Sequence, residues 1–158
     1  MTCEVSVIIV NWNTKDLLRD CLDSIYVNTH SVPFEVIVVD NNSKDLSVDM
    51  VKRDFPEVIL VENDKNYGFA KANNIGASKA SGRYLLLLNS DTLIMDKCIK
   101  RMVKCFEQDK SIGIVGAQLV RPNGQYQRSF FEFPSLKSEL KKAFFVDYIS
   151  RGRVKPKL

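Results

Sequence analysis

The sequence has almost none of the residues from which zinc sites are built. It contains a single histidine, His30, in a polar turn, and four cysteines with no CxxC spacing. A structural zinc site needs several such ligands at short spacings. A zinc site is therefore disfavoured. Buried free thiols are expected instead, because three of the four cysteines fall in apolar patterns; the four are Cys3, Cys21, Cys98 and Cys105.

Long apolar runs are also missing, and the net basic charge is confined to the last part of the chain. No run approaches the length of a membrane span, and Val5–Val10 is too short and lacks the basic leader of a signal peptide. A cytoplasmic location is therefore expected. Residues 135–158 hold seven Lys or Arg against two acids, which is +5, so residues 1–134 carry −1 of the +4 total. Without a basic body, no nucleic-acid partner is expected.

The glycine-rich loops that hold phosphates in many nucleotide-binding proteins are missing. The GxGxxG fingerprint should follow the first strand of a dinucleotide-binding fold, but VNWNTK at that place contains no glycine. The phosphate-binding loop GxxxxGK[ST] is absent as well. A nucleotide site in this chain would therefore need a cation or basic side chains to hold the phosphates.

What the sequence does contain is an alternation of apolar runs with segments of helical periodicity. This alternation predicts an α/β fold: βαβ crossovers and a mostly parallel sheet with helices on both faces. Strands are predicted at Glu4–Asn11, Phe34–Asp40, Glu57–Glu62, Tyr84–Leu88 and Ile112–Val120, with a hairpin returning over Gln125–Phe131. By length we expect one α/β domain, residues 1–134, followed by a basic amphipathic helix and tail, residues 135–158.

Four helices are predicted between these strands. The first is expected to be capped by Asn13 or Thr14, and the third, Phe69–Ala80, is rich in small residues. The inward positions expected for the first, second and fourth helices are Leu17, Leu18, Cys21, Leu22, Ile25 and Tyr26; Leu46, Met50, Val51 and Phe55; and, within Met95–Phe106, Ile99, Met102, Val103 and Phe106.

The strand at Tyr84–Leu88 is predicted to lie in the middle of the sheet, buried on both faces. Its five residues are all apolar, and the run stops abruptly at Asn89-Ser90-Asp91. Its carboxyl end would deliver Asp91 to the rim of the sheet, where α/β folds bind ligands. One carboxylate there suits a hard cation such as Mg²⁺ that also carries a ligand's phosphates. The alternative is that Asn89–Thr92 only turns the chain and caps the next helix.

Polar residues stand at the carboxyl end of every one of the first four predicted strands. They are Asn11-Trp12-Asn13, Asp40-Asn41-Asn42, Asn63–Asn66 with Gly68, and Asn89-Ser90-Asp91. Each group alone could be ordinary turn chemistry, but the four together predict a binding edge. An acid such as Asp40 can accept hydrogen bonds from a base or a ribose, Trp12 offers an aromatic surface, and Gly68 and Gly76 allow close approach of the backbone.

Four motifs in this chain resemble a known family. VSVIIVNWN, VIVVDNNS, NYGFAKANNIG and YLLLLNSDT, in this order, are similar to the inverting family 2 glycosyltransferases with the GT-A fold. Within this family, the motifs look like those of the rhamnosyltransferase-like enzymes of bacterial and archaeal polysaccharide assembly. The resemblance covers about Val5–Pro134. It implies a UDP- or dTDP-linked sugar donor, a glycan or lipid-linked acceptor, and a Mg²⁺ or Mn²⁺ cofactor.

Carried over by motif, the resemblance assigns donor-binding residues and one metal ligand. Asp91 would ligate the cation that bridges the donor diphosphate, at the end of the family's DxD motif, whose first acid is Asn89 in this chain. Asp40 would contact the base or ribose. The full donor-binding set is Asn11, Trp12, Asp40, Asn42, Asn66, Gly68, Asn73, Asn74 and Asn89.

The chain departs from the family after Phe133-Pro134-Ser135. Family members continue into an acceptor-binding half with a Glu-Asp pair that supplies the catalytic base, and none of the later acids here forms such a pair. No catalytic base is assigned, and the fold is expected to be truncated before the acceptor half. The chain is then either the donor-binding part of a glycosyltransferase, or a catalytically incomplete nucleotide-binding or interaction module.

The basic tail allows two readings. The apolar residues Leu136, Leu140 and Phe144, flanked by lysines, could contact an anionic membrane, at the inner face of which lipid-linked acceptors lie. Alternatively, this stretch only leads into a missing half, and its apolar face could then drive formation of a homodimer.

Overall fold

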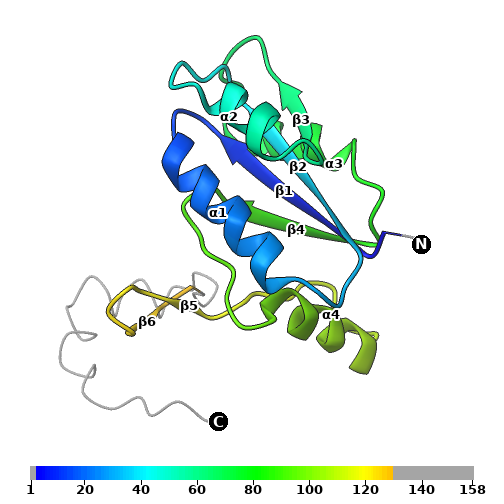
Figure 1. Cartoon of the computed structure of the whole chain (residues 1–158). Coiled ribbons are helices and arrows are strands. Elements are labelled where there is room, and N and C mark those ends of the chain that lie inside the picture. The colour runs from blue at the N-terminus through cyan, green and yellow to red at the C-terminus, as the bar shows by residue number, and fades with distance from the viewer. Residues whose placement is uncertain (1–2, 130–158) are drawn as a thin grey trace, which may run out of the picture. The chain divides into compact units, whose positions relative to one another are not determined.

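The computed structural model describes residues 3–129 of the chain. Four strands form one parallel sheet in the order β3-β2-β1-β4 (Figure 1). Every neighbouring pair in this sheet is parallel, which confirms the predicted mostly parallel sheet. The strands are β1 (Val5–Asn11), β2 (Phe34–Asp40), β3 (Ile59–Glu62) and β4 (Tyr84–Asn89).

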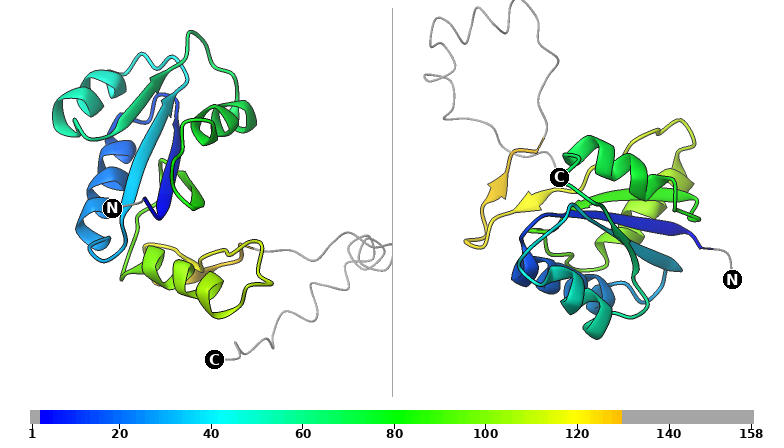
Figure 2. Two further views of the ribbon diagram at one scale, coloured as in Figure 1. Left: turned by 90° about the vertical axis from the view of Figure 1, so that its right-hand side faces the viewer. Right: turned by 90° about the horizontal axis from the view of Figure 1, so that it is seen from above.

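Helices cover both faces of this sheet, as predicted. The first face carries α1 (Lys15–Asn28), α2 (Ser47–Asp54) and α4 (Cys98–Gln108), whose apolar side chains join one cluster with the sheet. The opposite face carries α3 (Phe69–Ala77), which packs on β1 and β2. Figure 2 shows α1 and α2 on one side of the strands and α3 on the other.

The two faces of β1 and β2 explain why their sequences are almost uninterrupted Val and Ile. Val7, Ile9 and Val38 pack into the cluster with α1, while Ile8 and Ile37 pack beneath α3. Strands buried on both sides have no polar face to alternate with. Gly76 of α3 brings this helix close to β1, because a Cβ added there would lie 2.5 Å from Ile8 Cγ2. Gly76 therefore serves the packing of α3 on β1, and the approach of a ligand expected there stays a prediction.

The prediction that the Tyr84–Leu88 strand lies in the middle of the sheet is wrong for the part of the chain that the structure describes. β4 pairs only with β1 there and forms an edge of the sheet. Leu86 and Leu88 face the cluster with α1 and α4, but Leu85 and Leu87 are 52% and 55% exposed. α3 lies over β1 and β2, so no described helix covers the second face of β4.

The predicted fifth strand at Ile112–Val120 is also largely wrong. Only β5 (Leu119–Val120) is a strand, and it pairs antiparallel with β6 (Tyr126–Gln127) instead of joining the parallel sheet. The predicted hairpin is confirmed around Asn123-Gly124: Gly124 has a φ of 78°, and Arg121 N donates to Gln125 O at 2.8 Å. Glycine adopts this left-handed backbone without strain. The end of the predicted return strand, Phe130 and Phe131, lies outside the described residues.

Helix boundaries and some inward positions differ from the predictions. Leu17 and Leu46 were expected to pack inward, but they are 49% and 62% exposed, because Leu17 lies on the outer side of α1 and Leu46 precedes α2; the fourth helix, predicted from Met95, begins at Cys98. The remaining inward positions of α1, α2 and α4 are buried in the first-face cluster or packed against it, or, in the case of Phe106, stacked on Tyr84. The four cysteines are free, as predicted, but only Cys21 is fully buried.

Contacts divide the chain after Ala117 into two units, residues 1–117 and 118–158. The boundary predicted at residues 134 and 135, and the predicted basic helix after it, lie outside the described residues. Within the described range, no helix has both the length and the apolar character needed to cross a lipid bilayer.

A polar cluster at the amino end of the sheet fastens the turn that precedes β4. Glu35 accepts hydrogen bonds from Ser6 Oγ at 2.5 Å and from Ser81 N at 2.6 Å. Ser6 Oγ in turn accepts from Gly82 N at 2.8 Å. Partial burial acts to raise the pKa of the Glu35 carboxyl, but the hydrogen bonds from Ser6, Ser81 and Gly82 together outweigh it, so that the pKa is lowered. The ionised carboxylate therefore stabilises the fold.

Replacing Glu35 with glutamine is expected to lower the free energy of unfolding at pH 7 by about 1 kcal/mol, the scale of one ordinary hydrogen bond, because glutamine keeps an acceptor oxygen and loses only the charge. A carboxyl whose pKa is lowered by folding stabilises above its ordinary pKa of 4.5, and this stabilisation is lost as the pH falls through the lowered value. The difference between wild type and Glu35→Gln should therefore narrow below about pH 4.5. Urea unfolding across this range measures it, with Glu107→Gln on the exposed side of α4 as the control. A difference independent of pH would contradict the role given to the carboxylate.

Candidate functional site

Three strands end side by side at one edge of the sheet, as the sequence predicted. Asn11 at the end of β1 lies in register with Asp40 at the end of β2, and Val10 pairs with Asn89 at the end of β4. The ladder runs on between the strand ends, since Asn41 N donates to Asn11 O at 2.8 Å. The polar groups predicted from separate strands therefore meet at one place.

Asn11 is the most connected side chain at this edge, and it is fully buried. Its Nδ2 donates to Asp40 Oδ1 at 2.8 Å and to Ser43 Oγ at 3.1 Å, while its Oδ1 accepts from Thr14 Oγ1 at 2.7 Å. Asp40 is only 2% exposed, and its second oxygen accepts from Ser43 N at 2.8 Å. Both carboxylate oxygens of Asp40 are therefore engaged inside the protein, where they hold the start of the next loop. The contact with a donor expected for Asp40 stays a prediction.

The end of β4 is a tight turn that presents Asp91 to solvent. Thr92 N donates to Asn89 O at 3.1 Å, which closes the turn over Asn89-Ser90-Asp91-Thr92. Ser90 Oγ lies 2.9 Å from Thr14 Oγ1. Neither the Asp91 carboxylate nor the Asn89 amide makes a hydrogen bond or ion pair with another described residue, and both residues are exposed. The polar atoms of these two side chains are therefore available to a ligand.

The donor set at this turn suits a divalent cation only in company with a ligand. Among the described residues no three His, Cys, Asp or Glu side chains gather closely enough to hold a metal ion by themselves. Mg²⁺ is commonly held by one or two carboxylates together with the phosphates of a substrate, and the remaining positions keep water. A single free carboxylate, Asp91, flanked by the Asn89 amide, fits that kind of site.

The loops after β2 and β3 are tied together by asparagines. Asn41 is 2% exposed, and its Oδ1 accepts from Asn63 Nδ2 at 2.9 Å. Asn42 adopts a φ of 61°, and its Nδ2 donates to Asp64 O at 2.9 Å. Asn42 was predicted to contact the donor, and Asn41 was not among the predicted donor-binding residues, but the side chains of both asparagines join the two loops. Asn41 was missed because its burial cannot be read from a run of consecutive polar residues.

The start of α3 is built by Asn66 and Gly68. Gly68 stands at the N-cap with a φ of 78°, and Asn66 Oδ1 accepts from Gly68 N at 2.8 Å. No atom lies within 4 Å of where a Cβ at Gly68 would stand, so the backbone there is open to approach. On α3 itself, Asn73 is buried and its Nδ2 donates back to Phe69 O at 3.0 Å, whereas Asn74 is exposed. Asn74 is thus the more accessible of the two predicted contacts.

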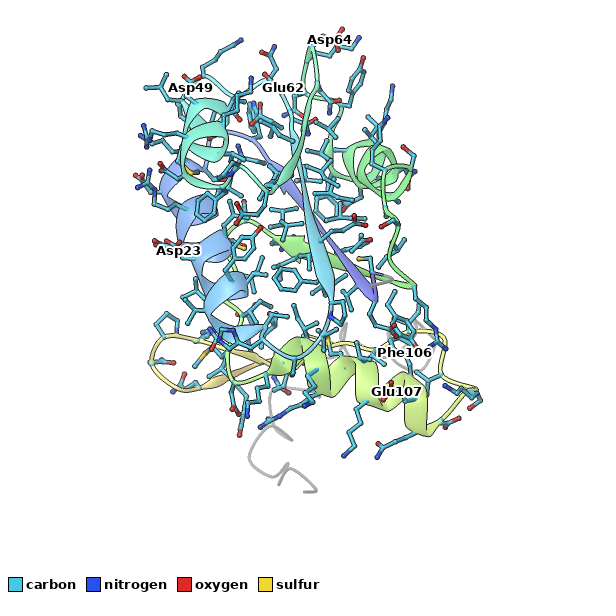
Figure 3. All side chains as sticks on the ribbon, turned by 45° about the vertical axis from the view of Figure 1, so that its right-hand side comes forward. Asp23, Asp49, Glu62, Asp64, Phe106 and Glu107 are labelled. Atoms are coloured by element: carbon cyan, nitrogen blue, oxygen red, sulfur yellow. The ribbon has the colours of Figure 1, made fainter. Side chains whose placement is uncertain are left out.

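Aromatic surface is available at this edge. Trp12 is 56% exposed directly after β1. Tyr67 lies under the ammonium group of Lys71, which is 3.8 Å from the ring centroid. A side-chain hydrogen bond with Asp64 raises the pKa of the Tyr67 hydroxyl. Figure 3 shows Asp64 at the tip of the loop after β3. Trp12 has the exposure that a stacking surface for a base needs.

The helix cap predicted at Asn13 or Thr14 is wrong in its chemistry. Thr14 stands at the N-cap of α1, but its hydroxyl makes no capping hydrogen bond, because it donates to Asn11 instead. Asp45 caps the helix from the loop after β2 and accepts from Lys15 N at 2.8 Å. The same carboxylate accepts from Ser47 N at 3.1 Å and from Ser47 Oγ at the start of α2. One side chain therefore satisfies the first turns of two helices.

Replacing Asp45 with alanine is expected to lower the free energy of unfolding by about 2 kcal/mol, because losing a cap costs about 1 kcal/mol per helix. These hydrogen bonds outweigh the effect of burial and lower the pKa of the Asp45 carboxyl, so the loss should be largest at neutral pH. Chemical denaturation measures it. Asp23→Ala, on the exposed side of α1, is the matched control and should change stability by less than about 0.5 kcal/mol. Equal effects of the two substitutions would contradict the capping role.

No described acid after Asp91 is placed as a catalytic base. Asp96 forms an ion pair with Arg101 at 2.7 Å, and Asp109 accepts from Ser111 N and Oγ, which lowers its pKa. Glu107 lies on α4, remote from the loop that carries Asp64 (Figure 3). The remaining three acids, Glu132, Glu139 and Asp147, lie outside the described residues.

The comparisons of this chain with a family model, with curated proteins and with solved structures agree with one another. A family model described as Glycosyl transferase family 2 matches residues 6–153. An O-antigen biosynthesis protein, RfbC, of Myxococcus xanthus is 31% identical over 130 residues, which are 81% of this chain and 10% of the relative. For eight of the curated relatives that it matches, the chain spans between 10% and 52% of the relative's length.

Two solved structures share the fold and carry ligands. A mannosyltransferase from Pyrobaculum calidifontis, in complex with GDP-Man and Mn²⁺, has a TM-score of 0.65 and 27% identity, over 78% of this chain and 37% of that one. Residues 1–349 of S. aureus TarS, in complex with UDP-GlcNAc, have a TM-score of 0.58 and 25% identity, over 66% of this chain and 31% of that one.

Proposed function

The chain belongs to glycosyl transferase family 2, and we propose that the edge formed by the ends of β1, β2 and β4 binds a nucleotide-diphosphate sugar. UDP- and dTDP-linked sugars are the donors proposed from the sequence motifs, and GDP enters as a third candidate because one structural relative was solved with GDP-Man. The observation that carries the proposal is the free carboxylate of Asp91 beside a polar edge to which three parallel strands contribute. Ligands of open α/β sheets bind at the carboxyl ends of the strands.

The residues at this edge divide into a supporting set and an accessible set. The buried side chains of Asn11, Asp40 and Asn41 hold the loops to each other. The exposed side chains of Trp12, Asn74 and Asn89 face solvent and can contact the donor. We propose that the base and ribose occupy the side of β1 and β2, and that the diphosphate lies toward the turn after β4.

Asp91, with the amide of Asn89, is proposed to hold Mg²⁺ or Mn²⁺ together with the donor diphosphate. When bound, such a cation neutralises the charge that develops on the departing nucleoside diphosphate. The substitution of asparagine for the first acid of the DxD pattern removes one negative charge from this turn. The diphosphate must therefore supply more of the coordination, and cation binding should depend on nucleotide.

For the whole protein we propose inverting transfer of the sugar to a glycan or lipid-linked acceptor. In such a reaction, an acceptor hydroxyl attacks the anomeric carbon, a carboxylate base accepts the hydroxyl proton, and the nucleoside diphosphate leaves on the opposite face. The described residues supply the donor side of this reaction. A base would come from outside them.

The second candidate is a module that binds nucleotide without transferring sugar. It is favoured by one observation: each described acid after Asp91 is paired, bonded locally, or remote from the strand ends. Transfer of sugar from a labelled donor to any acceptor by the purified 158-residue chain would exclude this candidate.

Calorimetric titration with UDP, dTDP and GDP, each with and without Mn²⁺, tests the proposal. We expect one nucleotide to bind and Mn²⁺ to strengthen its binding. The nucleotide that binds identifies the donor base, and the Mn²⁺ dependence identifies a cation-assisted site. Absence of binding to all three would overturn the proposed function for this chain.

A further inference from the structure

The hydroxyl groups of Thr14 and Ser90 join the turn after β4 to the buried amide at the end of β1. Thr14 has one hydroxyl hydrogen, and it is used at 2.7 Å on Asn11 Oδ1. The identity of that oxygen follows from the other end of the amide, because Asn11 Nδ2 must donate to the Asp40 carboxylate at 2.8 Å. The hydrogen bond of 2.9 Å between the two hydroxyls can then have only Ser90 as its donor.

The result is a directed chain of hydrogen bonds that crosses three strand ends. Ser90 donates to Thr14, Thr14 donates to Asn11, and Asn11 donates to Asp40. A buried carboxylate at one end fixes the direction of every bond, and each donor has a defined acceptor. Chains of this kind polarise one another and favour a single arrangement.

This chain is the main side-chain connection between the turn after β4 and the rest of the edge. The sheet ladder between β1 and β4 ends at the pair Val10 and Asn89, so Ser90 and Asp91 lie beyond it. The bond from Thr92 N to Asn89 O is internal to the turn. Cys21 Sγ makes only a weak thiol bond of 3.7 Å to Asn89 O, and the bonds from Ser24 and Asn28 of α1 hold the backbone at Ile94, three residues beyond Asp91.

We propose that Thr14 and Ser90 are positioning residues that hold the turn carrying Asp91 in the orientation used by the donor diphosphate and its cation. Neither side chain contacts the reacting atoms of the donor. Both act through the position that they give to Asn89 and Asp91. The link couples the cation side of the site to the buried Asn11 and Asp40 pair on the nucleotide side. The identity of the ligand in this inference rests on the proposed function. The link between Thr14 and Ser90 rests on the hydrogen-bond chain alone.

The link predicts a selective effect on binding. Without the Ser90 hydroxyl, the turn can adopt other orientations, and nucleotide with cation must select the competent one. A hydrogen bond of ordinary strength corresponds to about five- to tenfold in that equilibrium. Ser90→Ala should therefore reduce the strengthening of nucleotide binding by Mn²⁺ about five- to tenfold. Binding without Mn²⁺ should change less than about twofold, because Asn11 and Asp40 keep their bonds.

The experiment compares wild type with Ser90→Ala, Ser90→Thr and Thr14→Val by two measurements. Hydrogen exchange of the peptide containing residues 89–92, in the absence of ligand, reports the link itself. Titration of nucleotide with and without Mn²⁺ reports its consequence. We expect faster exchange and a weaker Mn²⁺ effect in Ser90→Ala, and recovery of both in Ser90→Thr, which keeps the hydroxyl. In a Thr14→Val background, Ser90→Ala should add nothing further.

Several outcomes would overturn the inference. Unchanged exchange at residues 89–92 in Ser90→Ala would show that the hydroxyl holds nothing. An equal loss of affinity with and without Mn²⁺ would indicate a general structural effect instead of positioning. Wild type that binds no nucleotide would contradict the proposed function and with it the donor part of this inference, while the exchange comparison would still decide whether the link exists.

Discussion

Replacing Asp91 with alanine is expected to abolish the strengthening of nucleotide binding by Mn²⁺ while leaving cation-independent binding in place. The Asp91 carboxylate is the one charged group of the turn after β4, and it has no hydrogen-bond or ion-pair partner among residues 3–129 to give up. Its loss would remove the proposed cation ligand without breaking a hydrogen bond or ion pair of the described residues. The free energy of unfolding of the ligand-free protein should accordingly change by less than about 0.5 kcal/mol.

The strengthening of nucleotide binding by Mn²⁺ can be measured as an increase in the stability of the folded protein. A ligand at a hundred times its dissociation constant stabilises the folded state by about 2.7 kcal/mol. For wild type with nucleotide, adding Mn²⁺ should raise the melting temperature further, and for Asp91→Ala it should not. Asp96→Ala is the matched control, because Asp96 is exposed, nearby in sequence and paired with Arg101. A Mn²⁺-dependent rise that survives in Asp91→Ala would remove this residue from the site.

Replacing Asn11 with aspartate is expected to lower the free energy of unfolding by about 3 kcal/mol or more at pH 7 and to eliminate nucleotide binding. The change keeps the shape of the side chain but turns a buried donor into a second carboxylate, 2.8 Å from Asp40 Oδ1. Two like charges in a buried site repel each other, and the oxygen that Asn11 Nδ2 satisfied loses its donor. The hydroxyl chain through Thr14 would be disturbed at the same time.

The pH dependence of this variant identifies the cause. Two adjacent carboxyls retain a shared proton, so folding raises the pKa of one of them above its unfolded value. A group raised in this way favours the folded state at low pH, so the defect of Asn11→Asp should shrink as the pH falls from 7 toward 4. Asn74→Asp, an equivalent change on an exposed residue of α3, should show neither the large loss nor this trend. Denaturation curves at several pH values measure this trend. A loss of unfolding free energy that stays constant with pH would contradict the explanation.

The parts of this molecule that could be predicted from sequence are those in which burial leaves a simple pattern. β1 and β2 read as unbroken Val and Ile because both of their faces are covered, and their ends were placed at Asn11 and Asp40. Parallel strands bring their carboxyl ends to one edge, so the meeting of Asn11, Asp40 and Asn89 followed from topology alone. The prediction of a binding edge depended on this geometric rule more than on any single motif.

The wrong predictions concern properties that a short stretch of sequence does not determine. A row of leucines in β4 indicates an apolar strand, but it does not say whether a neighbour covers the second face, and Leu85 and Leu87 are exposed. The apolar run from Ile112 holds two glycines and pairs with no strand before Leu119. The cap of α1 is supplied by Asp45 across thirty residues of sequence. Pairing across such a distance depends on the path of the intervening chain.

The double cap made by Asp45 also has a consequence for the order in which the domain assembles. The first turn of α1 is formed by residues that leave the ribosome thirty positions before the carboxylate that satisfies Lys15 N. A nascent chain that ends before Asp45 therefore holds an α1 whose first amides have only water as partners. β2 must be laid beside β1 before the loop after it can reach back to α1. We therefore expect completion of α1, docking of β2 and the start of α2 to be coupled during folding, because all three depend on the position of Asp45.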